Sequence, residues 1–430
     1  MNMTRRELGA SFGALATSAA LGGPGAKTHE ISVADALPSA VTPQLPRKAD
    51  FTIVDGYCYL NGAFSHPMPR ASADAFHQAV ERRTTLAPPG VPFVFLNPPP
   101  DTTPMPVDPR DEFAALINAK RKEISYIPNT STGENLLVEA LGITRFDGNV
   151  VTDALHFDGA LLHLMELKKR GLDLRLVMPH EGRIEMRDLE RVVDSKTKLI
   201  EVSLVSMYNG FQHDLKAVCD LAHAHGAYVY ADIIQGVGAV PLDVRATGVD
   251  FAATATYKWL MGDFGLGFLY VREELLGSVI RRTHWSYESA PDTEIHLSPL
   301  DPKFPTPLTW TPGGDATRYF QLGTMANGVA AALRVSLPYI RQLGVDNIQL
   351  WRQPMLRKLQ SEMPRLGFPA QTPPDSTSPI MTFAHKDAEA IKQKLQAARV
   401  AATVTPYYVR IAPSIYNDLH DIDRLLEALT

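Results

Sequence analysis

The chain has 430 residues, 45% of them hydrophobic and 21% charged, which is enough for a large domain and a smaller one, each with its own apolar core. Its formal net charge of −5 shows no basic excess, so nucleic acid and anionic membrane are poor candidate partners and a small-molecule substrate is favoured. The only cysteines, Cys58 and Cys219, indicate neither a disulfide framework nor a cysteine metal cluster.

The first 26 residues predict an export signal. Arg5 and Arg6 stand in TRRELG, which resembles a twin-arginine signal although Leu8 and Gly9 depart from the usual pattern, and a mildly apolar stretch follows. We therefore expect a signal peptide over 1–26, a linker over 27–48 and a periplasmic protein. The alternative is a cytoplasmic protein with a disordered tail. The apolar stretch is too short and too rich in glycine to span a membrane, so no membrane segment is expected in the mature form.

From Asp50 onward strand-like and helix-like segments alternate, which predicts an α/β fold with a mostly parallel sheet. The expected helices cover residues 111–124, 159–169, 188–193 and 214–225. The expected buried strands cover residues 149–152, 174–177, 199–203, 227–231 and 251–256.

Two proline-rich segments interrupt this alternation. Residues 88–107 cannot hold a helix and are expected to form a surface loop, whose Phe93 and Phe95 either line a substrate entrance or pin the loop to the domain. Residues 289–312 are expected to separate a large domain (49–300) from a C-terminal domain (301–430). No internal repeat is visible.

The segment 126–141, YIPNTSTGENLLVEAL, predicts an anion site. A strand ends near Ile127, small polar residues turn the chain, and a helix begins, so that backbone amides, hydroxyls and the helix dipole converge on one point. Ser131, Thr132 and Gly133 are the expected phosphate contacts. Taken alone, such residues usually do no more than cap a helix.

Two chemically suited side chains follow neighbouring strands further along. The strand 227–231 ends at Asp232, and the strand 251–256 leads to Tyr257 and Lys258. Pyridoxal phosphate needs a carboxylate to keep its ring nitrogen protonated and a lysine amine for the Schiff base, and partial burial lowers the pKa of such an amine. Either residue alone is more often a helix cap or a solvated side chain. Together they predict a pyridoxal phosphate site.

In this order the motifs resemble the class V aminotransferase family of fold type I pyridoxal phosphate enzymes. That group includes cysteine desulfurases, kynureninases and isopenicillin N epimerase-like proteins. The resemblance covers nearly everything after residue 50. It is carried by YLNGAFSHPMP (59–69), NTSTGENLL (129–137), HFDGALLHLMELKKRG (156–171), TYKWL (256–260), YFQLGTMANG (319–328) and VRIAPSIYNDLHDIDRLLEAL (409–429).

The resemblance implies a role for each matching residue. Lys258 would form the Schiff base and Asp232 would face the ring nitrogen. The other implied contacts are Gln235 to the ring hydroxyl; Phe157 stacked on the ring; Ser131, Thr132, Gly133, Thr256 and Tyr257 toward the phosphate; Gly323 and Thr324 toward the phosphate of a partner subunit; and Arg410 to the substrate carboxylate. A homodimer with shared sites is thereby implied. In the loop 203–215, Asn209 is preferred over Met207 and Tyr208 as the group above the cofactor.

The family resemblance leaves several reactions open. No cysteine follows Cys219, so the catalytic cysteine of desulfurases is missing and sulfur transfer through a protein persulfide is not expected. Transamination of an amino acid or an amino-acid-containing natural product is the leading expectation. An epimerase, with Tyr208, His284 or Tyr287 as a second acid or base, and a lyase for C–C or C–S bonds are the alternatives. A non-enzymatic binding module is disfavoured because Asp232, Lys258 and Arg410 are all retained.

Overall fold

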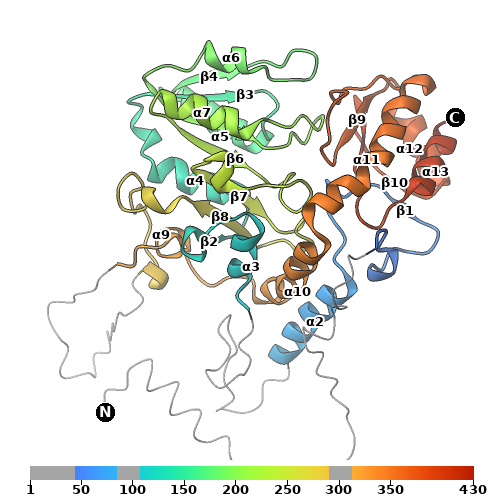
Figure 1. Cartoon of the computed structure of the whole chain (residues 1–430), viewed down its shortest axis with the longest axis horizontal. Helices are drawn as coiled ribbons and strands as arrows, with labels where there is room; N and C mark the ends of the chain where they lie inside the picture. Colours follow the sequence, from blue (N-terminus) through green and yellow to red (C-terminus); the bar gives the residue numbers. More distant parts are fainter. Residues whose placement is uncertain (1–43, 85–106, 290–311) are drawn as a thin grey trace, which may run out of the picture.

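The computed structural model describes residues 44–84, 107–289 and 312–430, and it shows a large domain with a smaller C-terminal domain beside it (Figure 1). The expected signal and most of the linker, the proline-rich loop up to residue 106 with Phe93 and Phe95, and the expected domain boundary at residue 300 lie outside the described residues. In the described part, no helix is long and apolar enough to cross a membrane.

The large domain is built on a seven-stranded sheet with the order β2-β8-β7-β6-β5-β3-β4. Only β8 runs against its neighbours β2 and β7, so the expectation of a mostly parallel α/β sheet is confirmed. The strands are β2 (Ile124–Ile127), β3 (Asn149–Asp153), β4 (Asp173–Val177), β5 (Thr197–Ser203), β6 (Tyr228–Asp232), β7 (Phe251–Ala255) and β8 (Gly267–Val271).

Helices cover this sheet, and most of its strands are therefore fully buried. Every residue of β2, β3, β7 and β8 is buried, a pattern typical of sheets that are packed on both sides. The helices of this domain are α3 (Pro109–Leu116), α4 (Thr130–Ala140), α5 (Asp158–Lys169), α6 (Met186–Glu190), α7 (Leu215–Ala224), α8 (Val244–Thr247) and α9 (Ala316–Phe320).

The C-terminal domain contains two small sheets. Strands β9 (Met381–Ala384), β11 (Thr403–Val404) and β12 (Tyr408–Ile411) form an antiparallel sheet in the order β11-β12-β9, while β1 (Cys58–Tyr59) pairs in parallel with β10 (Val400–Ala401). The chain's first described strand therefore completes its last domain. The helices here are α11 (Val345–Glu362), α12 (Ala388–Ala397) and α13 (Leu419–Leu429).

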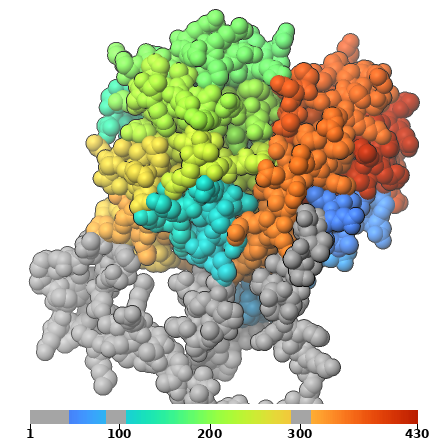
Figure 2. Space-filling view, in the orientation of Figure 1, coloured from blue at the N-terminus to red at the C-terminus, as the bar shows by residue number. Residues whose placement is uncertain are grey.

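Two further helices lie at the junction of the domains. Helix α10 (Asn327–Leu343) packs against α2 (Arg70–Thr84), and α10 leads directly into α11 (Figure 1). Figure 2 shows the C-terminal domain, in orange and red, packed directly against the large domain. The C-terminal domain also reaches the loop that follows β5, where Arg410 donates to the Met207 carbonyl.

One expected helix is too long. The sequence predicts a helix over 111–124, but α3 ends at Leu116 and β2 begins at Ile124. Asn118 adopts a left-handed backbone conformation with φ of 57°, which a continuing helix does not allow. The side chain of Asn118 donates to Asp243, a contact 125 residues away that a local pattern does not reveal.

Candidate active site

Asp232 and Lys258 meet where two parallel strands end. Asp232 is the last residue of β6, and Lys258 follows the end of β7 by three residues. The two strands pair directly, with Asp232 opposite Ala253. Both side chains are buried, at 4% and 8% exposure. The parallel register therefore places the expected acid and amine at one edge of the sheet.

Burial changes the protonation of both groups. It lowers the pKa of Lys258 to about 8, against the attraction of Asp232, and the nearby charge of Arg410 lowers it further. Burial also raises the pKa of Asp232, while His156, the Ile234 amide and Lys258 oppose that rise. A buried lysine with a pKa near 8 has a substantial neutral fraction at neutral pH, as a nucleophilic amine requires.

Gln235 is held beside this pair by two hydrogen bonds. Its side-chain nitrogen donates to the Ala63 carbonyl at 2.9 Å, and its oxygen accepts from the Trp259 indole at 3.1 Å. An amide nitrogen carries two hydrogens, so one is left for a ligand. The contacts orient Gln235, while its expected bond to a ring hydroxyl stays a prediction.

The residues before Lys258 have different environments. Thr256 is fully buried and donates to the Asp263 carbonyl at 2.7 Å, which holds the turn that carries the lysine. The Tyr257 ring stacks on Phe264 at 4.3 Å, and the Lys258 amine lies 5.7 Å from the Tyr257 ring centre. Tyr257 is half-buried, so its hydroxyl is a better candidate than Thr256 for contact with a phosphate.

The expected phosphate loop forms the start of α4. Asn129 caps this helix by accepting from the Thr132 amide at 2.9 Å, and the Gly133 amide donates to the Asn129 carbonyl. The backbone amides of Thr132 and Gly133 therefore already donate hydrogen bonds within the chain. Ser131 is the one of the three expected phosphate contacts whose amide does not donate to Asn129. Ser131 and Thr132 also line a cavity of about 660 Å³, whose other lining residues come mainly from α4 and α5 and do not include Asp232 or Lys258. The buried Thr130 hydroxyl, which the sequence analysis did not single out, has no partner among the described residues.

Arg410 reaches the site from the C-terminal domain. It is 5% exposed, and it donates to the Met207 carbonyl at 2.9 Å and to the Thr403 hydroxyl at 3.4 Å. Its Nε has no partner, and no acid pairs with it among the described residues. Burial lowers the pKa of the guanidinium. A buried cation without an anion is suited to bind a ligand carboxylate.

The positions of the remaining expected residues do not test their contacts with the cofactor. Phe157 precedes α5 and is half-buried, with its ring close to Gly159. The Asn209 side chain donates to the Gly182 carbonyl at 2.7 Å and accepts from the Phe211 amide, so it serves the local loop structure. Thr324 is exposed and its hydroxyl lies 3.2 Å from that of Tyr287, and nothing lies within 4 Å of a Cβ built on Gly323. The contacts of these residues with the cofactor stay predictions.

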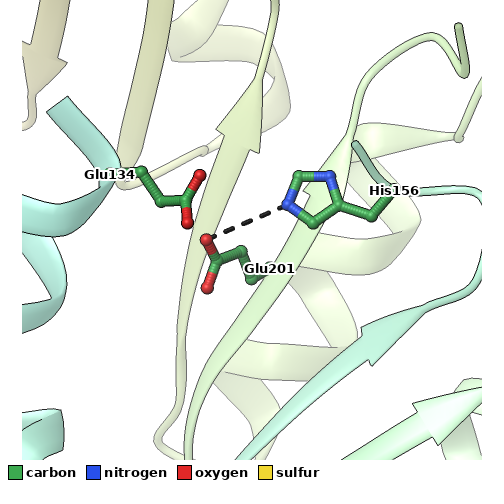
Figure 3. Close-up of side chains that lie close together, drawn as sticks. All are labelled: Glu134, His156 and Glu201. Atoms are coloured by element: carbon green, nitrogen blue, oxygen red, sulfur yellow. Dashed lines mark ion pairs between the residues drawn. The ribbon is translucent and has the colours of Figure 1, made fainter. Parts of the chain in front are cut away.

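Sequence reasoning missed a buried cluster of three titratable side chains behind this site. Glu134 projects from α4, Glu201 from β5, and His156 from the loop after β3 (Figure 3). One carboxylate oxygen or ring nitrogen from each side chain lies within 4.8 Å of those of the other two, and all three side chains are buried. One signal was available in the sequence, because a glutamate inside the apolar run LIEVS is unusual for a buried strand.

The matching family model agrees with this arrangement. The description of that model is aminotransferase class-V, and it matches residues 107–425. The chain belongs to the class-V aminotransferase family. Pyridoxal phosphate is accordingly its cofactor.

Individual relatives point toward carbon–sulfur chemistry. A probable cysteine desulfurase from Methanothermobacter thermautotrophicus is 29% identical over 280 residues, which are 64% of this chain and 65% of that protein. The cystine C–S lyase C-DES, solved with its product cysteine persulfide, has a TM-score of 0.73 at 18% identity and covers 87% of this chain and 98% of its own. A C-DES variant with glycine covalently linked to its pyridoxal phosphate has a TM-score of 0.75 at 18% identity, with coverages of 89% and 99%. The desulfurase relative lends no support to transamination, and the two solved structures, at 18% identity, show that the fold is shared.

The residues of this chain fit pyridoxal phosphate. A helix N-terminus with hydroxyl side chains suits its phosphate, a buried carboxylate suits its ring nitrogen, and a partly neutral lysine suits its aldehyde. The unpartnered Nε of Arg410 leaves a place for an amino-acid carboxylate at the same edge.

Proposed function

We propose that this protein is a pyridoxal phosphate-dependent lyase that cleaves the Cβ–S bond of a cysteine-derived amino acid such as cystine. The observation that carries the proposal is a buried amine beside a guanidinium that no acid of the described residues pairs with, in a chain whose two thiols are both buried. The family membership supports the cofactor, and the desulfurase and C–S lyase relatives support the bond that is broken.

Neither cysteine is suited to accept sulfur. Cys58 is 1% exposed and Cys219 is fully buried. Burial raises the pKa of Cys219 to about 12 and that of Cys58 also far above its usual value. Because the thiolate is the nucleophile, both thiols are inert near neutral pH. We infer that the sulfur leaves with a small-molecule product and does not pass to the protein.

The residues of this chain have separable roles in such a reaction. When bound, pyridoxal phosphate supplies the electron sink that weakens the bonds at Cα. Arg410 holds the substrate carboxylate and so fixes which Cα bond can break. The neutral amine of Lys258 takes the Cα proton, and the sulfur departs from Cβ with its bonding electron pair. Asp232 would face the ring nitrogen and would hold the proton there by its negative charge.

A product analysis tests the proposal. With L-cystine as substrate, we expect pyruvate, ammonium and a cysteine persulfide in equal amounts, since water releases the three-carbon fragment as a keto acid. A Cys58→Ala/Cys219→Ala double variant should give the same products at a similar rate. With L-cysteine as the substrate, alanine as the carbon product and sulfur on a protein cysteine would show a desulfurase instead. A keto acid that still contains its sulfur would show transamination, the reaction first expected from the sequence.

A further inference from the structure

One face of the central sheet carries a row of polar side chains behind the cofactor site. In the parallel pair β5 and β6, Glu201 lies opposite Tyr230 and Ser203 lies opposite Asp232. Paired residues, and residues two apart, share a face of the sheet, so all four side chains point to the same side. Glu201 therefore lies on the same face as Asp232, two residues before the β5 position that pairs with it. Asp232 is the carboxylate that is expected to face the ring nitrogen.

His156 and Glu134 cover this row. The Nδ1 of His156 lies 2.8 Å from the Ser203 hydroxyl, and its Nε2 lies 3.9 Å from a Glu201 oxygen, as the dashed line in Figure 3 shows. Glu134 comes from α4 on the other side of Glu201, and one of its oxygens lies 3.3 Å from Nδ1 of His163. His163 is half-buried and lines the 660 Å³ cavity, so the cluster has one end near solvent.

Several buried polar atoms in this cluster lack a hydrogen-bond partner within the described ranges. They are both carboxyl oxygens of Glu201, the Nε2 of His156 and the hydroxyl of Tyr230. Glu201, His156 and Tyr230 are all 0% exposed. A carboxylate that accepts no hydrogen bond in such a place is costly, and a second carboxylate beside it adds repulsion. This arrangement favours the protonated form of at least one carboxyl group of the pair.

Burial and the neighbouring charges shift the pKa values of both carboxyl groups upward. Burial raises the pKa of Glu201 to about 8, and the charge of Asp232 raises it further. The charge of His163 and the hydrogen-bonding capacity of the Glu134 carboxyl group oppose this rise. Burial raises the pKa of Glu134 to about 7, with added repulsion from Glu201. The titratable and charged groups that face the cluster are Glu134 on α4, His163 and the nearby Arg170 at α5, His156 after β3, Glu201 on β5, Tyr230 and Asp232 on β6, and Lys258 after β7.

We propose that Glu134, His156 and Glu201 act as positioning residues that retain one shared proton behind Asp232, and that this proton keeps Asp232 ionised toward the cofactor's ring nitrogen. An ionised Glu201 would repel Asp232 and favour its protonation, and Asp232 could then no longer hold the ring-nitrogen proton electrostatically. The inference rests on the cofactor and is independent of which bond the enzyme cleaves.

Infrared spectroscopy of the cofactor-free protein tests where the proton lies. At pH 7 we expect a carbonyl-stretch band of a protonated carboxyl group, which disappears as the pH rises through about 8. The double variant Glu134→Gln/Glu201→Gln should remove the band, because either carboxyl group can hold the shared proton. Asp232→Asn should keep it, as should the matched control Glu190→Gln, since Glu190 is exposed on α6. Absence of the band at pH 7 in the wild type, or its survival in the double variant, would overturn the proposal.

Cofactor affinity tests the effect on Asp232. At pH 7 we expect the Kd for pyridoxal phosphate in Glu201→Gln to lie within about twofold of the wild-type value, because glutamine replaces a carboxyl group that is already neutral. A Kd several-fold lower in Glu201→Gln would mean that the wild type holds the proton on Asp232 and a charge on Glu201, and would contradict this step. Elemental analysis provides a third outcome, since about one tightly bound divalent cation per chain would mean that the three side chains are metal ligands and would overturn the proton assignment.

Discussion

Arg410 shows how a single buried charge defines a binding preference. Its guanidinium is held by two oxygen acceptors, the Met207 carbonyl and the Thr403 hydroxyl, and neither is charged. A ligand carboxylate would complete its coordination. A bond of this kind to a charged group contributes about 1.5–3 kcal/mol, or roughly 10- to 100-fold in affinity.

We therefore expect Arg410→Gln to raise the KM for an amino-acid substrate about 10- to 100-fold. Arg410→Lys should recover only part of this loss, because an ammonium keeps the charge but lacks the planar fork that pairs with a carboxylate. Steady-state kinetics with the intact substrate checks the expectation, and the same substrate as its methyl ester serves as the control. If the ester loses as much affinity as the acid, Arg410 does not bind the carboxylate.

The lowered pKa of Lys258 has a kinetic consequence. Only the neutral amine attacks an aldehyde, so the rate of pyridoxal phosphate capture by the cofactor-free protein should rise about tenfold per pH unit and level off near pH 8. Stopped-flow absorbance measures this rate. With Nα-acetyl-lysine, whose side-chain amine is free and has the ordinary pKa, the rate of capture should keep rising beyond pH 8.

The acid neighbour of Lys258 should shift this profile in a defined direction. The attraction of Asp232 raises the pKa of Lys258, in opposition to burial. In Asp232→Asn the attraction is lost, so the midpoint of the capture profile should move below pH 8. A midpoint that stays in place or moves upward would mean that the two groups are not electrostatically coupled.

At the scale of elements, the loop after β5 connects the two domains beside the site. The Tyr208 carbonyl accepts from the Thr382 hydroxyl at 2.7 Å, and the Gly210 carbonyl accepts from the Ser376 hydroxyl at 2.8 Å. The same loop provides the Met207 carbonyl that holds Arg410. Its conformation therefore fixes both the domain contact and the substrate-binding cation.

Gly210 is the residue in this loop that tolerates a side chain least. Its φ is +72°, and a Cβ there would lie 2.2 Å from the Ile380 carbonyl oxygen. Gly226 offers a matched control, because its φ is +75° but nothing lies within 4 Å of its Cβ position. We expect both alanine variants to lose about 1–2 kcal/mol from the left-handed backbone, and Gly210→Ala to lose about 1–3 kcal/mol more. Denaturant unfolding measures the difference, and equal losses would refute the contact argument.

The sequence pattern predicts elements well where the signal is local. The buried strand over 227–231 and the one over 251–256 were expected within a residue of their observed bounds, since short apolar runs between turns are distinctive in parallel sheets. The pairing of β1 with β10 was not predicted, because nothing local in Cys58 and Tyr59 indicates a partner some 340 residues away. The Glu134, His156 and Glu201 cluster was missed for the same reason, as three elements contribute one residue each.

At the scale of the whole molecule, the resemblance of Gly323 and Thr324 to a family loop that contacts the phosphate of a partner subunit leads us to expect a dimer as the working unit. In this chain Thr324 is exposed, and its hydroxyl lies 3.2 Å from that of Tyr287. A residue that serves only a neighbouring copy lies on the surface of the isolated chain. We expect a symmetric homodimer in solution, in which each site borrows this loop.

Mixing two inactive variants tests that arrangement. Lys258→Ala removes the amine from its own site, and Thr324→Glu places a negative charge where the partner's phosphate is expected, so each homodimer should be inactive. In a mixed dimer one site combines an intact Lys258 with an intact Thr324. Random association of equal amounts makes half of the dimers mixed, and activity should recover to about a quarter of the wild-type value. The two variants measured separately are the controls. If the mixture stays inactive although mass spectrometry finds mixed dimers, the loop does not serve the neighbouring site, because a shared site regains every missing part by exchange.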